Sequence, residues 1–124
     1  MNICNAINYA ASELKNNRIN SAQLDSEILM SKVLKKDRKY LIINSKSELN
    51  DKQYLNFRKL ISDRLRGKPV AYLTGSKSFW KYDFDLNSNV LIPRPDTELI
   101  IEQVLEIYKN KKRINFLEVG TGSG

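Results

Sequence analysis

The chain has 124 residues, 41% of them hydrophobic and 28% charged, with one cysteine and no histidine. This composition is ordinary for a globular protein and leaves room for one compact domain and part of a second. No apolar run approaches the roughly 20 residues of a membrane span, and the amino terminus lacks a signal-peptide pattern. A lone Cys4 excludes an internal disulfide, and the lack of histidine argues against a zinc site or a histidine-based relay. We therefore expect a cytoplasmic protein without a metal ion or a membrane segment.

The formal net charge of +7 is unevenly distributed along the chain. Residues 1–75 carry 14 Lys and Arg against 7 Asp and Glu, whereas residues 76–124 carry 7 of each kind. A basic front module favours an acidic partner, either a protein face or RNA, although a solvated lysine-rich surface explains the same count. No arginine-rich run or aromatic stacking pattern supports RNA, so we do not expect direct nucleic-acid binding.

The first third of the chain predicts two helices by the spacing of its apolar residues. The first helix is expected from Asn2 to Lys15, and Asn16-Asn17 ends it. Ser21 is a suitable N-cap for the second helix, with Asp25 and Glu27 near its positive end. The buried stripe of this second helix is predicted to be Leu24, Ile28, Leu29 and Val33.

The next segment completes a helical bundle. A short element is predicted over Arg38–Asn44, and a third long helix opens at Asp51 with an apolar face. Gly67 and Pro69 act as a helix stop, and Val70–Gly75 is expected to be a bridge leaving the bundle. Four amphipathic elements of this kind are sufficient to close a small core.

An aromatic segment follows the bundle. Residues 78–86 alternate in part and predict a β-hairpin with its turn near Lys81. The pair Phe79-Trp80 is more typical of packing on a neighbouring domain than of substrate contact, although both interpretations are open. Residues 90–92 predict a short strand.

Two prolines then enclose Arg94 in a rigid extended segment. Asp96 is expected to cap a helix from Thr97 to about Lys109. A rigid loop before a capped helix either orients Arg94 beside an active site or forms a structural corner with Arg94 in a surface ion pair. The inward face of this helix is predicted to contain Leu99, Ile100, Val104, Leu105 and Tyr108.

The last eleven residues have the pattern of a cofactor pocket. The apolar run Ile114–Val119 predicts a buried parallel strand, and Gly120, Gly122 and Gly124 follow it at alternate positions. Such glycines let the backbone turn sharply and approach a ligand closely. The spacing differs from the dinucleotide pattern and suits S-adenosylmethionine (SAM) better, with Glu118 placed to hold the ligand's ammonium group. The alternative interpretation of these three glycines is a glycine-rich linker without a ligand.

Four motifs together resemble the HemK/PrmC family of protein-(glutamine-N5) methyltransferases. The matching segments are GKPVAYLTG at 67–75, FW at 79–80, LIPRPDTE at 91–98 and LEVGTGSG at 117–124. Their order and spacing are those of the family, and the resemblance covers the whole chain.

The resemblance implies a fold and three segments. The expected architecture is an α-helical N-terminal bundle, a β-hairpin and the truncated start of a Rossmann-like α/β class I methyltransferase domain. Residues 1–75 would bind peptide-chain release factors, 76–93 would form the hairpin linker, and 94–124 would begin the SAM-dependent domain. We expect this chain to be a monomer.

The resemblance also implies an activity and a site. The family transfers a methyl group from SAM to the side-chain amide of the glutamine in the Gly-Gly-Gln loop of release factors. Carried over by motif, Glu118, Gly120, Thr121, Gly122, Ser123 and Gly124 would bind SAM, and Arg94 would lie near the pocket. The family more often has Asp where this chain has Glu118, a change we expect SAM binding to tolerate.

The family's catalytic Asn-Pro-Pro-Tyr motif would lie beyond Gly124, so this chain contains no predicted catalytic residue and we expect no methyl transfer by it alone. Two alternatives stay open: a SAM-dependent adenine-N6 nucleic-acid methyltransferase and a non-catalytic partner-binding module. We also expect that residues 114–124 do not hold a strand without neighbours on both sides, because an isolated strand leaves its backbone groups unpaired.

Overall fold

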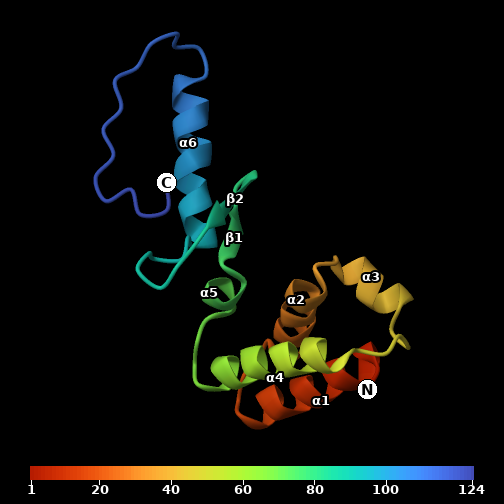
Figure 1. The fold of residues 1–124 in the computed structure, drawn as a ribbon. Helices are drawn as coiled ribbons and strands as arrows, with labels where there is room; N and C mark the ends of the chain where they lie inside the picture. Colours follow the sequence, from red (N-terminus) through yellow and green to blue (C-terminus); the bar gives the residue numbers. More distant parts are fainter. The chain divides into compact units, whose positions relative to one another are not determined.

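The computed structural model describes residues 1–124 and divides them into two compact units, Met1–Thr74 and Gly75–Gly124 (Figure 1). The first unit is all helical. It contains α1 (Ile3–Asn16), α2 (Ala22–Leu34), α3 (Arg38–Ile43), α4 (Asp51–Leu65) and α5 (Val70–Thr74). The second unit contains the antiparallel hairpin of β1 (Ser76–Phe79) and β2 (Tyr82–Asp85), a 3₁₀ turn and α6 (Glu98–Tyr108).

Side-chain caps set the starts of the helices in the first unit. The side chain of Asn2 accepts a hydrogen bond from the Asn5 backbone at 2.8 Å, and Asp37 caps α3 in the same way at 2.9 Å. Asn50 and Gln53 form a reciprocal capping box at the start of α4. Each cap satisfies a backbone N–H that has no partner inside its helix. The predicted bounds of α1, α3 and α4 are therefore confirmed within one or two residues.

The core of the first unit lies where α1, α2 and α4 meet (Figure 1). Its largest fully buried apolar side chains are Leu14, Leu29, Met30, Phe57 and Ile61. They come from three helices, so each amphipathic stripe is covered by the other two.

The predicted buried stripe of α2 is partly wrong. Leu24 is 44% exposed, whereas Asp25 and Ser26 face the core together with Leu29. Arg64 on α4 donates to the Asp25 carboxylate at 2.7 Å, and this pair turns α2 so that the acid lies inside. Ser21 stands at the N-cap position, but its side chain makes no capping hydrogen bond.

Residues 70–74 form the short helix α5 and not the predicted bridge. The Pro69 carbonyl accepts from the backbone of Tyr72 and Leu73, which starts the helix directly after the proline. Lys32 of α2 donates to the Thr74 carbonyl at 2.7 Å. The predicted stop of α4 is correct, since Gly67 has a φ of 93° that ends the helix.

The hairpin is confirmed with its turn at the expected place. Phe79 pairs with Tyr82, so Trp80 and Lys81 form a two-residue turn. Trp80 adopts a left-handed φ of 56°, which such tight turns require. The rings of Phe79 and Phe84 meet edge to face with centroids 6.1 Å apart.

Several predictions for the second unit are wrong. Residues 90–92 form no strand, and a 3₁₀ turn over Pro95–Thr97 precedes α6. Asp96 therefore lies inside that turn and makes no capping hydrogen bond. The apolar residues of α6 are not buried: Leu99 is 62% exposed and Ile100 63%. A two-stranded hairpin offers too little surface to cover a helix of this length.

Ile114–Val119 is not a strand, and Leu117 is 86% exposed. The second unit holds no strand beside this segment with which its backbone could pair. This agrees with the expectation that the segment needs neighbours on both sides. The described residues thus form a helical bundle and a hairpin, without the parallel sheet of a Rossmann-like domain. None of the helices has the length and apolar character needed to cross a bilayer.

Candidate functional site

The predicted cofactor residues line one cavity in the second unit. Arg94, Glu118 and all five residues of the loop 120–124 border a space of ≈ 620 Å³, together with the aromatic pair Phe79 and Phe84. The volume is within the range of about 300–1,000 Å³ usual for small-molecule sites. Residues that are distant in sequence thus meet at one place: a proline-framed arginine, a carboxylate, a glycine loop and two aromatic rings.

The Pro93-Arg94-Pro95 segment holds Arg94 in an extended conformation, with φ of −98° and ψ of 139°. The Arg94 carbonyl accepts from the Thr97 backbone at 3.1 Å, which anchors the segment to the 3₁₀ turn. Arg94 forms no ion pair with any described residue, and Asp96 caps no helix. Neither element of the structural-corner interpretation is observed, and the guanidinium remains available to an anionic ligand group.

The glycine loop adopts backbone conformations that other residues avoid. Gly120, Gly122 and Gly124 have φ angles of 76°, 66° and 117°. A Cβ atom on Gly124 would meet the Phe84 ring at 3.7 Å, whereas one on Gly120 would point into open space. The alternate glycines are therefore required chiefly by backbone conformation, with the Gly120 position leaving room for a ligand to approach.

The chemistry of the cavity suits a zwitterionic ligand with an apolar part. A cation at Arg94 and an anion at Glu118 are complementary to the carboxylate and ammonium of an amino-acid group. The rings of Phe79 and Phe84 offer an apolar surface to the rest of such a ligand. No group of three or more metal-ligating side chains exists in the structure.

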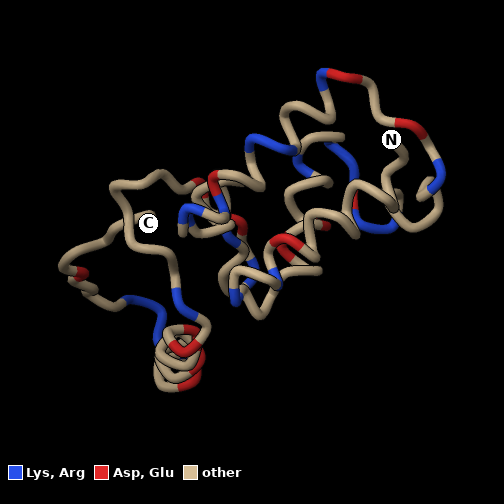
Figure 2. Tube along the Cα trace, turned by 90° about the horizontal axis from the view of Figure 1, so that it is seen from below, with Lys and Arg blue, Asp and Glu red and all other residues tan.

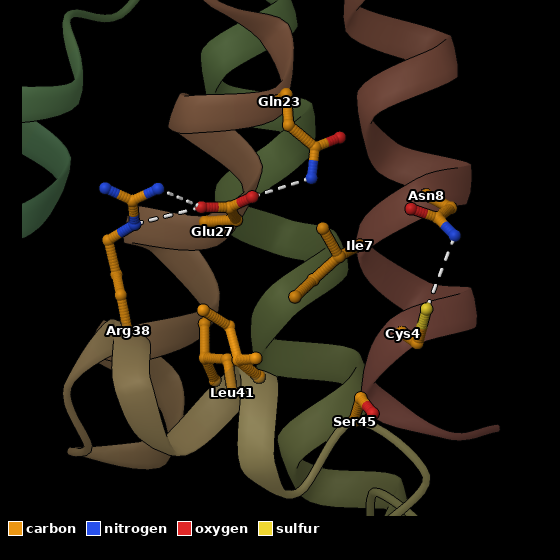
Figure 3. Close-up of a pocket in the computed structure, with 9 residues that line it drawn as sticks. Cys4, Ile7, Asn8, Gln23, Glu27, Arg38, Leu41 and Ser45 are labelled. Atoms are coloured by element: carbon orange, nitrogen blue, oxygen red, sulfur yellow. Dashed lines mark hydrogen bonds and ion pairs between the residues drawn. The ribbon is translucent and has the colours of Figure 1, made fainter.

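A second candidate site is a groove between α1, α2 and α3 in the first unit (Figure 3). Its volume is ≈ 250 Å³, and Ile7 and Leu41 form its apolar floor. One wall is a row of hydrogen bonds in which Gln23 donates to Glu27 at 2.7 Å and Arg38 Nε donates to the same carboxylate at 2.9 Å. The hydrogen bond from Gln23, with a further contribution from Arg38, holds the pKa of Glu27 below its ordinary value, against the opposing effect of burial.

The opposite wall of the groove comes from α1, where the Asn8 amide donates to the Cys4 sulfur at 3.4 Å (Figure 3). Cys4 is an exposed free cysteine, and its sulfur accepts this weak hydrogen bond. The groove thus offers an apolar pocket with a polar rim, which is the form of a site for one apolar side chain of a protein partner.

The surface beside the groove is both apolar and basic. Ile42 and Ile43 of α3 are 77% and 81% exposed. Lys35, Lys36 and Lys39 are exposed and form no ion pair, and basic residues outnumber acidic ones in the first unit (Figure 2). A surface with exposed isoleucines and with lysines that form no ion pair is chemically complementary to an acidic protein face.

Several contacts between distant residues were not predicted from the sequence, and two of them bear on the buried face of α2 and on the candidate cavity. One is the Asp25–Arg64 pair described above, for which no sequence signal exists because the two residues are 39 positions apart. The other joins Glu98 to the backbone of Trp80 at 2.7 Å. Trp80 and Glu98 both belong to motifs noted in the sequence, but their contact was not predicted.

The described residues form a helical module followed by a smaller unit in which a hairpin, a helix and a glycine loop border one cavity. Residues 5–75 match the family described as the PrmC N-terminal domain, and the chain belongs to that family. This confirms the resemblance inferred from the motifs.

The chain is similar to release factor glutamine methyltransferases from several bacteria. It is 39% identical over 124 residues to that of Buchnera aphidicola subsp. Baizongia pistaciae, covering 100% of this chain and 44% of the relative. The protein of Leptospira interrogans is 43% identical over 112 residues, covering 90% of this chain and 39% of the relative. A "Bifunctional methyltransferase" of Rickettsia conorii is 34% identical over 139 residues, covering 93% and 26%. The chain spans less than half of the length of these relatives.

Proposed function

We propose that this chain is a portion of a SAM-dependent methyltransferase. This enzyme would methylate the side-chain amide of the glutamine in the Gly-Gly-Gln loop of peptide-chain release factors. The observation that carries the proposal is the meeting of Arg94, Glu118 and the glycine loop on one cavity. Relatives named release factor glutamine methyltransferase support the choice of substrate. The proposed division is a release-factor-binding module over 1–75, a hairpin linker over 76–93 and the start of the methyltransferase domain over 94–124.

The residues of the cavity would bind and orient the cofactor. When bound, SAM supplies an electrophilic methyl group. The Glu118 carboxylate would hold the ligand's ammonium group, and backbone N–H groups of the loop 120–124 would meet its carboxylate. Arg94 would add positive charge beside the cofactor, and its two flanking prolines would limit the backbone freedom that is lost on binding.

Methyl transfer to an amide needs more than these residues. The nitrogen lone pair of an amide is delocalised, so the NH₂ group must be held and aimed at the methyl carbon. The Asn-Pro-Pro-Tyr motif that the family uses for this does not occur among the 124 residues. We therefore propose that the chain by itself binds SAM but does not transfer its methyl group.

Isothermal calorimetry with SAM tests the cofactor proposal. We expect Glu118→Ala to weaken binding about tenfold or more, because it leaves the ammonium group unpaired, and Glu102→Ala on the exposed side of α6 to leave it unchanged. Binding that is equal in both variants would contradict the assignment. Deleting the gene and measuring glutamine methylation of release factors by mass spectrometry tests the activity independently. Adenine methylation lost in place of glutamine methylation would favour the nucleic-acid alternative.

The partner proposal places the release factor on the groove and on α3. Ile42→Asp would put a charge on the exposed apolar part of this surface. Leu55→Asp is the matched control, because Leu55 is 67% exposed on α4 and away from the groove. We expect Ile42→Asp to weaken binding of a purified bacterial release factor about tenfold or more, and Leu55→Asp to leave it unchanged. If both variants bound the release factor equally well, the proposed location of the interface would be wrong.

A further inference from the structure

The turn of the hairpin is held by a residue that belongs to the helix on the other side of the cavity. Glu98 is the first residue of α6, and its Oε1 accepts a hydrogen bond from the Trp80 backbone N–H at 2.7 Å. A carboxylate acceptor makes this bond shorter and stronger than a neutral one. Trp80 has a φ of 56°, a conformation that a tryptophan adopts only when its surroundings hold it.

The contact connects two walls of the candidate cofactor cavity. Trp80 follows Phe79 directly, and Phe79 packs edge to face on Phe84. Both rings line the cavity on the hairpin side. Glu98 follows Arg94 by four residues, and Arg94 lines the cavity from the proline-framed segment. Fixing the turn against the start of α6 therefore fixes the aromatic wall relative to Arg94.

We propose that Glu98 is a positioning residue that sets the aromatic wall of the cavity by clamping the hairpin turn. Glu98 itself does not line the cavity. The clamp stands on the structure alone, and its use in binding SAM rests on the proposed function. A negative charge at the first residue of a helix is also favoured by the helix dipole.

The bond involves the backbone of residue 80, so its strength depends on the acceptor at 98. Glu98→Gln keeps an oxygen acceptor on a side chain of the same length, whereas Glu98→Ala removes it. Glu102→Ala is the matched control, because Glu102 lies one turn further along α6, is exposed and forms no ion pair. The amide signals of α6 in each of the four proteins report whether the second unit keeps its helix.

The experiment is NMR on the 124-residue chain, with hydrogen exchange of the Trp80 amide and the ring-proton shifts of Phe79 and Phe84. We expect Glu98→Ala to accelerate exchange at Trp80 about tenfold and to shift both sets of ring signals. Glu98→Gln should restore most of the protection, and Glu102→Ala should match the wild type. Addition of SAM should show affinity lowered several-fold for Glu98→Ala and nearly normal for Glu98→Gln.

Each contrary result has a distinct meaning. Equal Trp80 exchange in the wild type and Glu98→Ala would show that no clamp exists and would overturn the inference. Faster exchange with unchanged ring shifts would also overturn it, because the turn would then be held without setting the aromatic wall. A wild-type chain that does not bind SAM would count against the proposed cofactor function, and the clamp would still be decided by exchange and ring shifts.

Discussion

Removing the cation of the buried pair between α2 and α4 should destabilise the helical unit strongly. The Asp25 side chain is 7% exposed and that of Arg64 19%, with Arg64 Nε 2.7 Å from the carboxylate. Arg64→Met keeps most of the apolar stem but leaves the Asp25 charge buried without its partner. Breaking a buried pair in this way costs about 3–5 kcal/mol. A unit of this size has a free energy of unfolding of roughly 4–11 kcal/mol, so the loss would approach the lower limit.

The matched control is Arg58→Met on the same helix. Arg58 pairs with Glu13 of α1, but their side chains are 34% and 29% exposed, so water can replace the partner. We expect that substitution to cost about 1 kcal/mol or less. Replacing both Asp25 and Arg64 by apolar residues of similar volume should be far less harmful than Arg64→Met, because no charge then stays buried.

Urea unfolding followed by far-UV circular dichroism measures these differences. Five of the six α-helices, α1 to α5, belong to the first unit, so most of the helix signal reports on its unfolding. The reasoning would be refuted if Arg64→Met cost no more than Arg58→Met. It would also be refuted if the double variant were as unstable as the single one, because the loss would then come from packing and not from the unpaired charge.

Three further predictions concern local contacts. Hydrogen bonds lower the folded-state pKa of Glu27, so its contribution to stability is full above the ordinary pKa of 4.5 and is lost as the pH falls through the lower folded value. The loss of unfolding free energy caused by Glu27→Gln, measured in urea, should therefore become smaller in acid, and a loss that does not change with pH would contradict this. Asn50→Ala should lower the free energy of unfolding by about 0.5–2 kcal/mol, because it removes the capping box of α4. Ser21→Ala removes no capping hydrogen bond and should change the free energy of unfolding little, so equal effects of the two substitutions would refute the assignment of the cap. Gly120→Ala should weaken SAM binding in calorimetry because a φ of 76° strains alanine, and unaltered affinity would show that the loop changes conformation on binding.

Local signals in the sequence were sufficient for most of the helical unit and for the hairpin. Asn2 and Asn50 satisfy the first backbone N–H groups of α1 and α4 from within a few residues, and Gly67 ends α4 by its own backbone freedom. The glycines that we propose for cofactor binding were equally visible, since alternate glycines after an apolar run are a short local pattern. These features depend on neighbours in sequence, which is why a sequence alone reveals them.

Contacts between distant residues determined the rest. Which face of α2 is buried depended on Arg64 of α4, because a carboxylate enters a core only when a cation meets it there. The clamp from Glu98 to Trp80 likewise appeared only in the folded unit, whereas the family resemblance had already predicted that Arg94 lies near the glycine loop. Conversely, the apolar segment 114–119 has the composition of a strand and is not one, because a strand exists only through hydrogen bonds to neighbouring strands. The sequence by itself determined the longer helices, the hairpin and the residues that we propose for cofactor binding. Tertiary structure decided the short helix α5, the buried faces and the absence of a strand at 114–119, because burial and pairing need a partner surface.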